Sequence, residues 1–208
     1  MSRVRAVKRN QIVVYQGEAV SSVCRVVDGM VRAYSILSTG NEVLVALFGK
    51  GDYFPAGSLF DTTPVALFYY ETMTDCTLEF LDPQTAAGGL VRSEHEQAKN
   101  ARRYIGALLH VNALGQPTAS ERIMHTLRYL TTRFGVTLPN KRFVRIDVKL
   151  TQHDIARLCN VSRETASIEL AKLRKDNIIV QKSKMYTVNI PLLNKRIGDD
   201  GLGGIDTL

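Results

Sequence analysis

The sequence predicts an α+β protein in which a β-rich N-terminal domain is followed by a long helix and a C-terminal winged helix-turn-helix. Three observations support this fold class. Glycines recur between short β-prone runs in the first half, one long helical pattern follows, and two short amphipathic helices lie between strand-like runs further on. We place the boundaries at 1–94 for the β domain, 95–116 for the helix, 117–196 for the winged domain and 197–208 for a flexible acidic tail.

The glycines of the first half are regularly spaced. Gly17, Gly29, Gly40 and Gly51 stand 12, 11 and 11 residues apart. Runs of β-prone residues alternate with them and continue afterwards, at residues 11–15, 23–27, 31–37, 42–48, 66–73 and 76–81. Short strands with turn residues at this spacing are typical of a β-barrel or β-sandwich.

The central segment has a helical period. Ala98, Ala101, Ile105 and Leu108 recur at spacings of three and four, which predicts a helix over about residues 94–114. Its place between the β domain and the winged domain indicates a helix through which two copies of the chain form a homodimer; the alternative is a helix that packs only on its own β domain. A capping box, Thr118-x-x-Glu121, then begins a further helix that ends at Gly135.

The segment 151–175 is typical of a helix-turn-helix. Thr151 and Asp154 resemble a capping box, Asn160 tolerates the left-handed conformation of a sharp turn, and Ser162 is a favourable N-cap. In the second helix a buried stripe is predicted at Ala166, Leu170 and Leu173. The residues that lie off this stripe and can face DNA are Arg163, Glu164, Ser167 and Ile168.

Strand-like runs flank the two helices and complete a winged helix. Residues 143–150 alternate apolar and charged side chains, as a half-buried strand does. Residues 178–188 break at Lys182-Ser183-Lys184, which we interpret as a hairpin tip. Lys182 and Lys184 are therefore candidates for contacts with DNA phosphates, which add affinity without reading sequence.

Positive charge is concentrated in this C-terminal segment. Residues 118–196 contain 16 Lys and Arg against 6 Asp and Glu, a net of +10, whereas residues 1–117 contain 11 of each. Such a local excess is the electrostatic footprint of a nucleic-acid-binding module. Double-stranded DNA is therefore the expected partner.

Composition excludes several other classes. The chain has 45% hydrophobic residues, yet no apolar run long enough for a membrane span and no secretory leader, so we expect a cytoplasmic protein without a membrane partner. Its three cysteines are widely separated, so no metal site is expected. We find no nucleophile–base pattern and no phosphate-cradling glycine loop, so neither an enzyme nor a cofactor is expected.

The chain resembles the Crp/Fnr family of transcription regulators over nearly its whole length. The most specific match is the run Val161-Ser162-Arg163-Glu164-Thr165, which is similar to the start of the family's recognition helix. The resemblance implies a β-roll, or jelly roll like that of cyclic-nucleotide-binding domains, and a homodimer on an inverted repeat near a promoter. RNA polymerase is then an expected partner, and an effector at the β-roll and central helix is expected to reorient the DNA-binding domains.

The resemblance also assigns site residues. Arg163 and Glu164 match the residues that read a G·C pair, in which Arg donates to guanine and Glu accepts from cytosine. Ser162 and Thr165 match phosphate-holding positions, and Gln152 and His153 are further phosphate candidates. Ile168 departs from the pattern, because relatives similar to the cyclic-AMP receptor protein carry a second base-reading Arg there; isoleucine can instead contact a thymine methyl.

The effector region departs further from the family. Ala56, in the stretch 55–60, stands where the ribose-binding Glu is expected, and residues 65–67 supply no Arg for the phosphate. We therefore expect that cyclic AMP is not the effector. The stretch 54–70 is also similar to the 2-oxoglutarate-sensing nitrogen regulators, although Leu67 replaces their anion-binding Arg. Arg103 stays available as an anion partner.

Two alternatives stay open at this stage. Either a non-nucleotide small molecule binds in a pocket of the β domain and central helix, or the protein is able to bind DNA without an effector. The candidate pocket residues are Phe54, Ala56, Gly57, Ser58, Phe68, Tyr70, Arg103 and Leu108. His95 and His110 are conceivable haem ligands but are interpreted as ordinary surface or interface histidines, and Cys24 with Cys76 is a conceivable redox switch. The alternative function is a β-roll regulatory subunit whose basic C-terminal domain binds a partner other than DNA.

Overall fold

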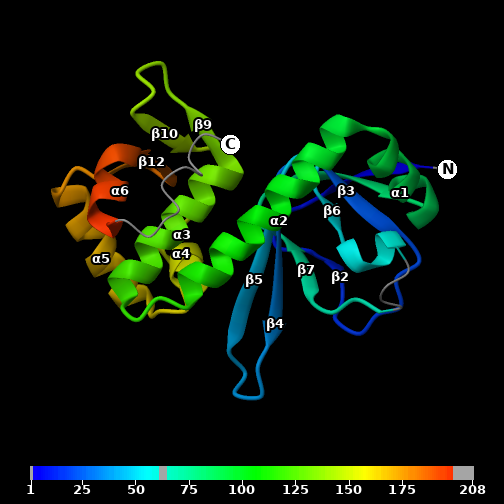
Figure 1. Ribbon diagram of the computed structural model, residues 1–208. Helices are drawn as coiled ribbons and strands as arrows, with labels where there is room; N and C mark the ends of the chain where they lie inside the picture. Colours follow the sequence, from blue (N-terminus) through cyan, green and yellow to red (C-terminus); the bar gives the residue numbers. More distant parts are fainter. Residues whose placement is uncertain (1, 61–64, 199–208) are drawn as a thin grey trace. The chain divides into compact units, whose positions relative to one another are not determined.

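Two antiparallel four-stranded sheets form the N-terminal part of the protein (Figure 1). The first has the order β1-β8-β3-β6 and the second β2-β7-β4-β5. The computed structural model describes residues 2–60 and 65–198 and divides into two compact units, Met1–Ala98 and Lys99–Leu208. The strand bounds are β1 Arg3–Val7, β2 Ile12–Val14, β3 Val23–Asp28, β4 Val31–Ile36, β5 Glu42–Phe48, β6 Tyr53–Phe54, β7 Tyr69–Thr72 and β8 Cys76–Leu81.

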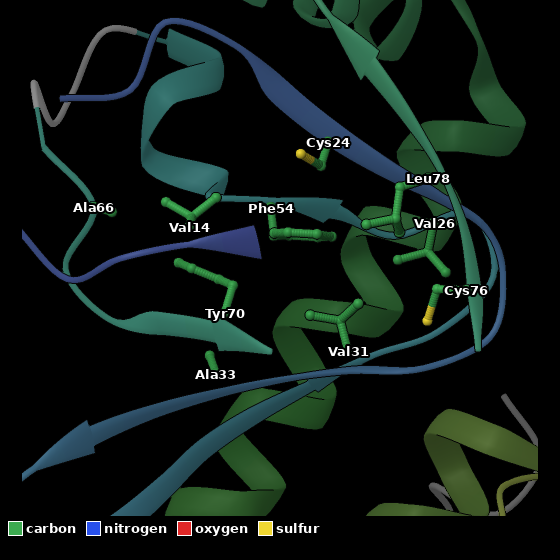
Figure 2. Close-up of a cluster of buried hydrophobic side chains, with 10 residues drawn as sticks. All are labelled: Val14, Cys24, Val26, Val31, Ala33, Phe54, Ala66, Tyr70, Cys76 and Leu78. Atoms are coloured by element: carbon green, nitrogen blue, oxygen red, sulfur yellow. The ribbon is translucent and has the colours of Figure 1, made fainter. Parts of the chain in front are cut away.

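The hydrophobic core of this unit takes residues from both sheets (Figure 2). Phe54 is fully buried, and its ring stacks on that of Tyr70 at a centroid distance of 5.2 Å. The other members of this core cluster are Val14, Cys24, Val26, Val31, Ala33, Ala66, Cys76 and Leu78. Successive side chains of a strand point to opposite faces, so the alternation along β3 and β4 directs one face of each strand inward. The expected β-rich N-terminal domain is confirmed, and it consists of two sheets.

The turn between β3 and β4 explains one of the regularly spaced glycines. Gly29 has φ +92°, which side-chain-bearing residues rarely adopt, and a Cβ atom there would lie 2.6 Å from both the Asp75 carbonyl oxygen and the Cys76 sulfur. The turn therefore needs glycine for its backbone conformation and for its close approach to the start of β8. Gly17, Gly40 and Gly51 also have positive φ values, as turn residues.

Some elements of the first unit were not predicted from the sequence. They are β1, β6, a 3₁₀ helix at Ala56–Phe60 and α1 at Pro83–Arg92. Helix α1 begins with Asp82 as N-cap, whose side chain accepts from the Thr85 N–H, and with proline in its first turn. The Asp82-Pro83 pair was the available signal, but the two glycines inside α1 obscure its helical pattern.

Helix α2, Glu94–Leu114, begins in the first unit and ends in the second, with the bounds that its period predicted. Helix α3, Ala119–Phe134, also follows its prediction: Thr118 and Glu121 form both bonds of the capping box, and Gly135 is the C-cap. Gly135 has an extended backbone rather than the left-handed one, and a Cβ there would overlap the Thr131 carbonyl. Space, not backbone conformation, requires glycine at this helix end.

The rest of the second unit is a small sheet with three helices (Figure 1). The sheet order is β11-β12-β10-β9, and all its neighbouring strands are antiparallel. The bounds are β9 Gly135–Thr137, β10 Phe143–Ile146, α4 Gln152–Leu158, α5 Arg163–Lys175, β11 Ile179–Lys182, β12 Met185–Asn189 and α6 Ile190–Ile197. This arrangement is the predicted winged helix.

One strand of this unit is shorter than its alternating pattern predicted. Strand β10 ends at Ile146, and residues 147–150 are irregular. Although Val148 and Leu150 are buried as the pattern required, the Leu150 N–H donates to the Lys184 carbonyl, 2.9 Å away, at the tip of the β11–β12 hairpin. The predicted flexible acidic tail falls mostly on residues 199–208, which lie outside the described residues.

Candidate nucleic-acid interface

Helix α4 is held at its start by the predicted capping box. The Asp154 carboxylate accepts from the Thr151 N–H at 2.8 Å and from its hydroxyl at 2.7 Å, and the Thr151 oxygen accepts from the Asp154 N–H at 3.1 Å. Ile155, Ala156 and Leu158 are buried, so the apolar face of α4 packs inward. Gln152 is half-buried and His153 is exposed in the first turn.

The turn after α4 has the geometry that Asn160 predicted. Asn160 adopts φ +49°, and the Val161 N–H donates to the Ala156 carbonyl at 3.0 Å. Cys159, at the C-cap, is fully buried, and burial raises the pKa of its thiol to about 12. The turn is therefore closed by backbone hydrogen bonds over a buried side chain, and it fixes the direction in which α5 leaves.

Helix α5 presents the residues expected to read DNA. Ser162 is its N-cap: its oxygen accepts from the Thr165 N–H at 3.1 Å and lies 3.0 Å from the Thr165 hydroxyl. Ala166, Leu170 and Leu173 form the buried stripe. On the opposite side, Arg163 and Glu164 are exposed, Ser167 is half-buried and Ile168 is 58% exposed. The outward placement of Arg163, Glu164 and Ile168 agrees with their predicted positions.

The charges at the start of α5 suit base recognition. The pKa of the Glu164 carboxyl is lowered, first by the hydrogen bond from its own backbone N–H and then by Ser162 and the Arg163 guanidinium. At neutral pH the carboxylate is therefore ionised and can only accept hydrogen bonds, whereas Arg163 can only donate. One exposed helical turn thus combines a pure donor with a pure acceptor, as a G·C pair requires.

The hairpin between β11 and β12 ends in two exposed lysines, Lys182 and Lys184, on either side of Ser183 at φ +56°. This tip is tied to α5 and to the segment just before α4. The Arg174 guanidinium of α5 donates to the Gln181 amide oxygen at 2.5 Å, and the Gln181 amide donates to the Ser183 carbonyl at 3.1 Å. The N–H of Leu150, just before α4, donates to the carbonyl of Lys184, which is also at the tip.

Gln181 and Arg174 were missed in the sequence. A glutamine in a strand and an arginine at a helix end carry no signal by themselves. Their role depends on the hairpin folding back onto α5, which brings Arg174 beside Gln181, seven residues further along the chain. Together they tie the hairpin tip to α5, the helix that carries Arg163 and Glu164.

The candidate effector residues come from both compact units, and within the first unit they differ in burial. Phe54 and Tyr70 belong to the packed core, with Phe68 partly buried against it. In the 3₁₀ turn that follows β6, Ala56 is exposed, Gly57 is half-buried and Ser58 is buried. Arg103, half-buried, and Leu108, 52% exposed, lie on α2 in the other unit. The aromatic side chains therefore act first as core residues of the β domain.

The strand register excludes a disulfide between Cys24 and Cys76, the conceivable redox switch. Cys24 pairs with Phe80 across β3 and β8, four residues along β8 from Cys76. At about 3.3 Å per residue this separation is near 13 Å, well beyond the roughly 7 Å between Cα atoms that a disulfide spans. Burial also raises the pKa of both thiols, that of Cys24 to about 12, so neither is a reactive thiolate at neutral pH.

The two histidines considered as haem ligands differ in environment. His95 is exposed on α2. His110 is 4% exposed, and its Nε2 atom lies 2.9 Å from the Leu158 carbonyl oxygen, so the expectation of an ordinary surface or interface histidine was wrong for this residue. Within the described residues, no group of three or more His, Cys, Asp and Glu side chains is placed to hold a metal ion.

Comparison with known proteins matches both halves of the chain. Residues 4–88 match the model of the cyclic nucleotide-binding domain, and residues 121–196 match that of the Crp-like helix-turn-helix domain. The regulatory protein HlyX of Actinobacillus pleuropneumoniae is 22% identical, covering 91% of this chain and 79% of its own. The global nitrogen regulator of Synechocystis is 24% identical, covering 91% and 85%.

A solved structure supports the same fold. The crystal structure of a CRP-family transcriptional regulator from Thermus thermophilus superposes with a TM-score of 0.71 at 22% identity, covering 94% of this chain and 97% of that one. None of the helices in the described part of the chain is long and apolar enough to cross a membrane. By its two domains, their order, the capped recognition helix and the wing, this chain belongs to the Crp/Fnr family of transcription regulators and carries a helix-turn-helix DNA-binding domain.

Proposed function

We propose that this regulator binds an inverted-repeat operator as a homodimer, with Arg163 and Glu164 reading base edges in each half-site. The observation that carries the proposal is the exposure of this donor–acceptor pair at the capped start of α5. Ser162 and Thr165 lie in the same turn, where backbone N–H groups and the helix dipole favour phosphate. Further contacts with DNA phosphates come from Lys182 and Lys184 on the wing and from Gln152 and His153 on α4.

The homodimer is supported by the two faces of α2. Gly106, Leu109, His110 and Ala113 are buried. The other face exposes Tyr104 at 67%, Leu108 at 52% and Val111 at 68%, and Ala101 continues this stripe. Positions 101, 104, 108 and 111 have the spacing of three and four that forms the seam between two coiled helices. A second copy of α2 fits this stripe because it offers the same apolar spacing.

Charge in that seam is expected to break the dimer. Val111→Glu places two carboxylates against each other and against apolar side chains, so the protein should sediment at its monomer mass of 23.1 kDa instead of twice that value. Arg102→Glu, on the same helix but off the stripe, makes the larger change of charge, two units against one, and should still leave the mass unchanged. If analytical ultracentrifugation gives the dimer mass for both Val111→Glu and the parent protein, the dimer contact lies elsewhere.

Cyclic AMP is not the effector in this proposal. Ala56 is exposed in the 3₁₀ turn where the family resemblance expects a ribose-binding glutamate, and an alanine side chain cannot accept from a hydroxyl. Calorimetric titration of the full-length protein with cyclic AMP should give no heat of specific binding, and saturating nucleotide should leave its DNA affinity unchanged. Micromolar binding that tightens DNA binding would contradict this.

Either another small molecule regulates this protein or none does. Measuring DNA affinity of the purified protein, without added metabolites, separates the two cases: full affinity at physiological salt indicates constitutive binding.

We further propose that this regulator acts in the cytoplasm and contacts RNA polymerase. What supports this part of the proposal is the match of residues 121–196 to the Crp-like helix-turn-helix domain.

Selection from a random DNA pool tests the proposed function directly. The expected result is enrichment of a two-fold symmetric site, with half-sites one helical turn apart, about 10–10.5 base pairs from centre to centre. A half-site that differs from those read by a second arginine is expected because of Ile168. Failure to enrich any sequence would favour the alternative, a regulatory subunit whose basic domain binds a partner other than DNA.

A further inference from the structure

The ring of His110 joins the central helix to the helix-turn-helix. Its Nε2 atom lies 2.9 Å from the carbonyl oxygen of Leu158, the last residue of α4. Carbonyl groups in the last turn of a helix have no partner within the helix, so the ring supplies one. A carbonyl can only accept, and therefore Nε2 carries the hydrogen and donates.

The position of the ring is fixed by packing. It stacks on Tyr129 of α3 at a centroid distance of 4.9 Å, with 13° between the planes. Leu109 and Ala113, on the same face of α2, are also buried. Gly106 lies against Arg133 so closely that a Cβ would overlap its side chain. The C-terminal half of α2 is thus packed onto α3, and His110 extends this packing to α4.

The same stretch of α2 carries the proposed dimer contact. Leu108 and Val111 are exposed on one face, and His110 between them is buried on the other. A displacement of this helical turn is therefore passed to the end of α4. From there it reaches α5, because the turn between the two helices is closed by the Val161 N–H bond to Ala156 and by the buried Cys159.

We propose that His110 is a positioning residue that sets the distance and orientation between the two recognition helices of the dimer. This inference rests on the proposed function. An operator of two half-sites requires both α5 helices at one fixed separation, whereas a single half-site does not. His110 therefore matters for the spacing of half-sites and not for base reading within one of them.

The test compares His110→Phe with the parent protein on selected operators whose half-site spacing is changed by one and two base pairs. Phenylalanine keeps an aromatic ring to stack on Tyr129 but has no N–H. We expect its affinity for the optimally spaced operator to fall about ten-fold, the usual size of coupling between two sites. Its affinity for DNA with a single half-site should stay within about two-fold, and its preference for one spacing should disappear.

Two further variants control the comparison. His110→Gln retains an amide N–H and should restore most of the spacing preference. His95→Phe makes the same substitution at an exposed position of the same helix and should behave as the parent protein. If His110→Phe does not fold, His110→Asn, whose shorter side chain does not reach the Leu158 carbonyl, takes its place with the same expected loss.

The outcomes separate this inference from the proposed function. If the parent protein selects no DNA, the proposed function fails. If it selects an operator and His110→Phe keeps the full spacing preference, only the role of His110 is overturned. A parallel loss of affinity for half-site and operator, with a lowered melting temperature, would also overturn it, because that pattern indicates a role in folding alone.

Discussion

Replacing Arg163 with alanine is expected to remove discrimination at one base pair of each half-site while leaving binding to unrelated DNA nearly intact, and Glu164→Ala should do the same. The exposed pair offers a bidentate donor and an ionised acceptor, and each such contact discriminates against a wrong base by about 1–3 kcal/mol. Competition between the selected operator and single-base variants measures this loss directly.

The control for this prediction lies on the same helix. Lys175 is exposed in the last turn of α5, three turns from the base-reading residues, so Lys175→Ala changes the charge without touching the base contacts. It should leave the ranking of operator variants unchanged. If the Arg163→Ala and Glu164→Ala proteins also rank the variants as the parent does, base reading belongs to other residues.

Replacing Phe54 with alanine is expected to destabilise the β domain by about 3–5 kcal/mol, the usual cost of removing a large aromatic side chain from a core. Phe54 is fully buried, stacks on Tyr70 at 5.2 Å and contacts Phe48 at 5.7 Å between ring centroids. Because the protein has two units, hydrogen exchange of amides in β3 and β4 is the suitable measurement, since it reports on this unit alone.

Leu67→Ala provides the comparison, because Leu67 is 55% exposed and its truncation should change stability by no more than about 0.5 kcal/mol. The Phe54 result also bears on the effector question. If Phe54 chiefly lined a binding site, its removal would weaken ligand binding at little cost in stability. A loss below about 1 kcal/mol would therefore contradict its assignment to the core.

Elements whose signal is local were predicted closely. Strands β5 and β8 and helices α2 and α3 have the bounds expected from period, capping box and terminal glycine. Strands β1 and β6 were missed, because Arg3–Val7 is mostly exposed and β6 has two residues, so neither carries an alternating apolar pattern. Strand β10 was predicted too long, because Val148 and Leu150 are buried although the hydrogen-bonded strand already ends at Ile146.

The start of the recognition helix could be derived from its own residues. Thr151, Asp154, Asn160 and Ser162 act through bonds to positions at most five residues away, which any folded context preserves. The exposed side of α5 follows from its buried stripe for the same reason. The outward position of the proposed DNA-reading pair was therefore predictable from the local sequence alone.

His110, Gln181 and Phe54 acquire their roles only in the folded chain. His110 bonds to a carbonyl 48 residues away, Gln181 depends on a hairpin folded against α5, and Phe54 stacks on a tyrosine from the opposite sheet. A side chain's burial and partner are set by which distant segments pack against it, and no local pattern contains that information. The chemistry proposed to meet DNA is thus encoded locally, whereas the contacts that hold it in position arise only from tertiary packing.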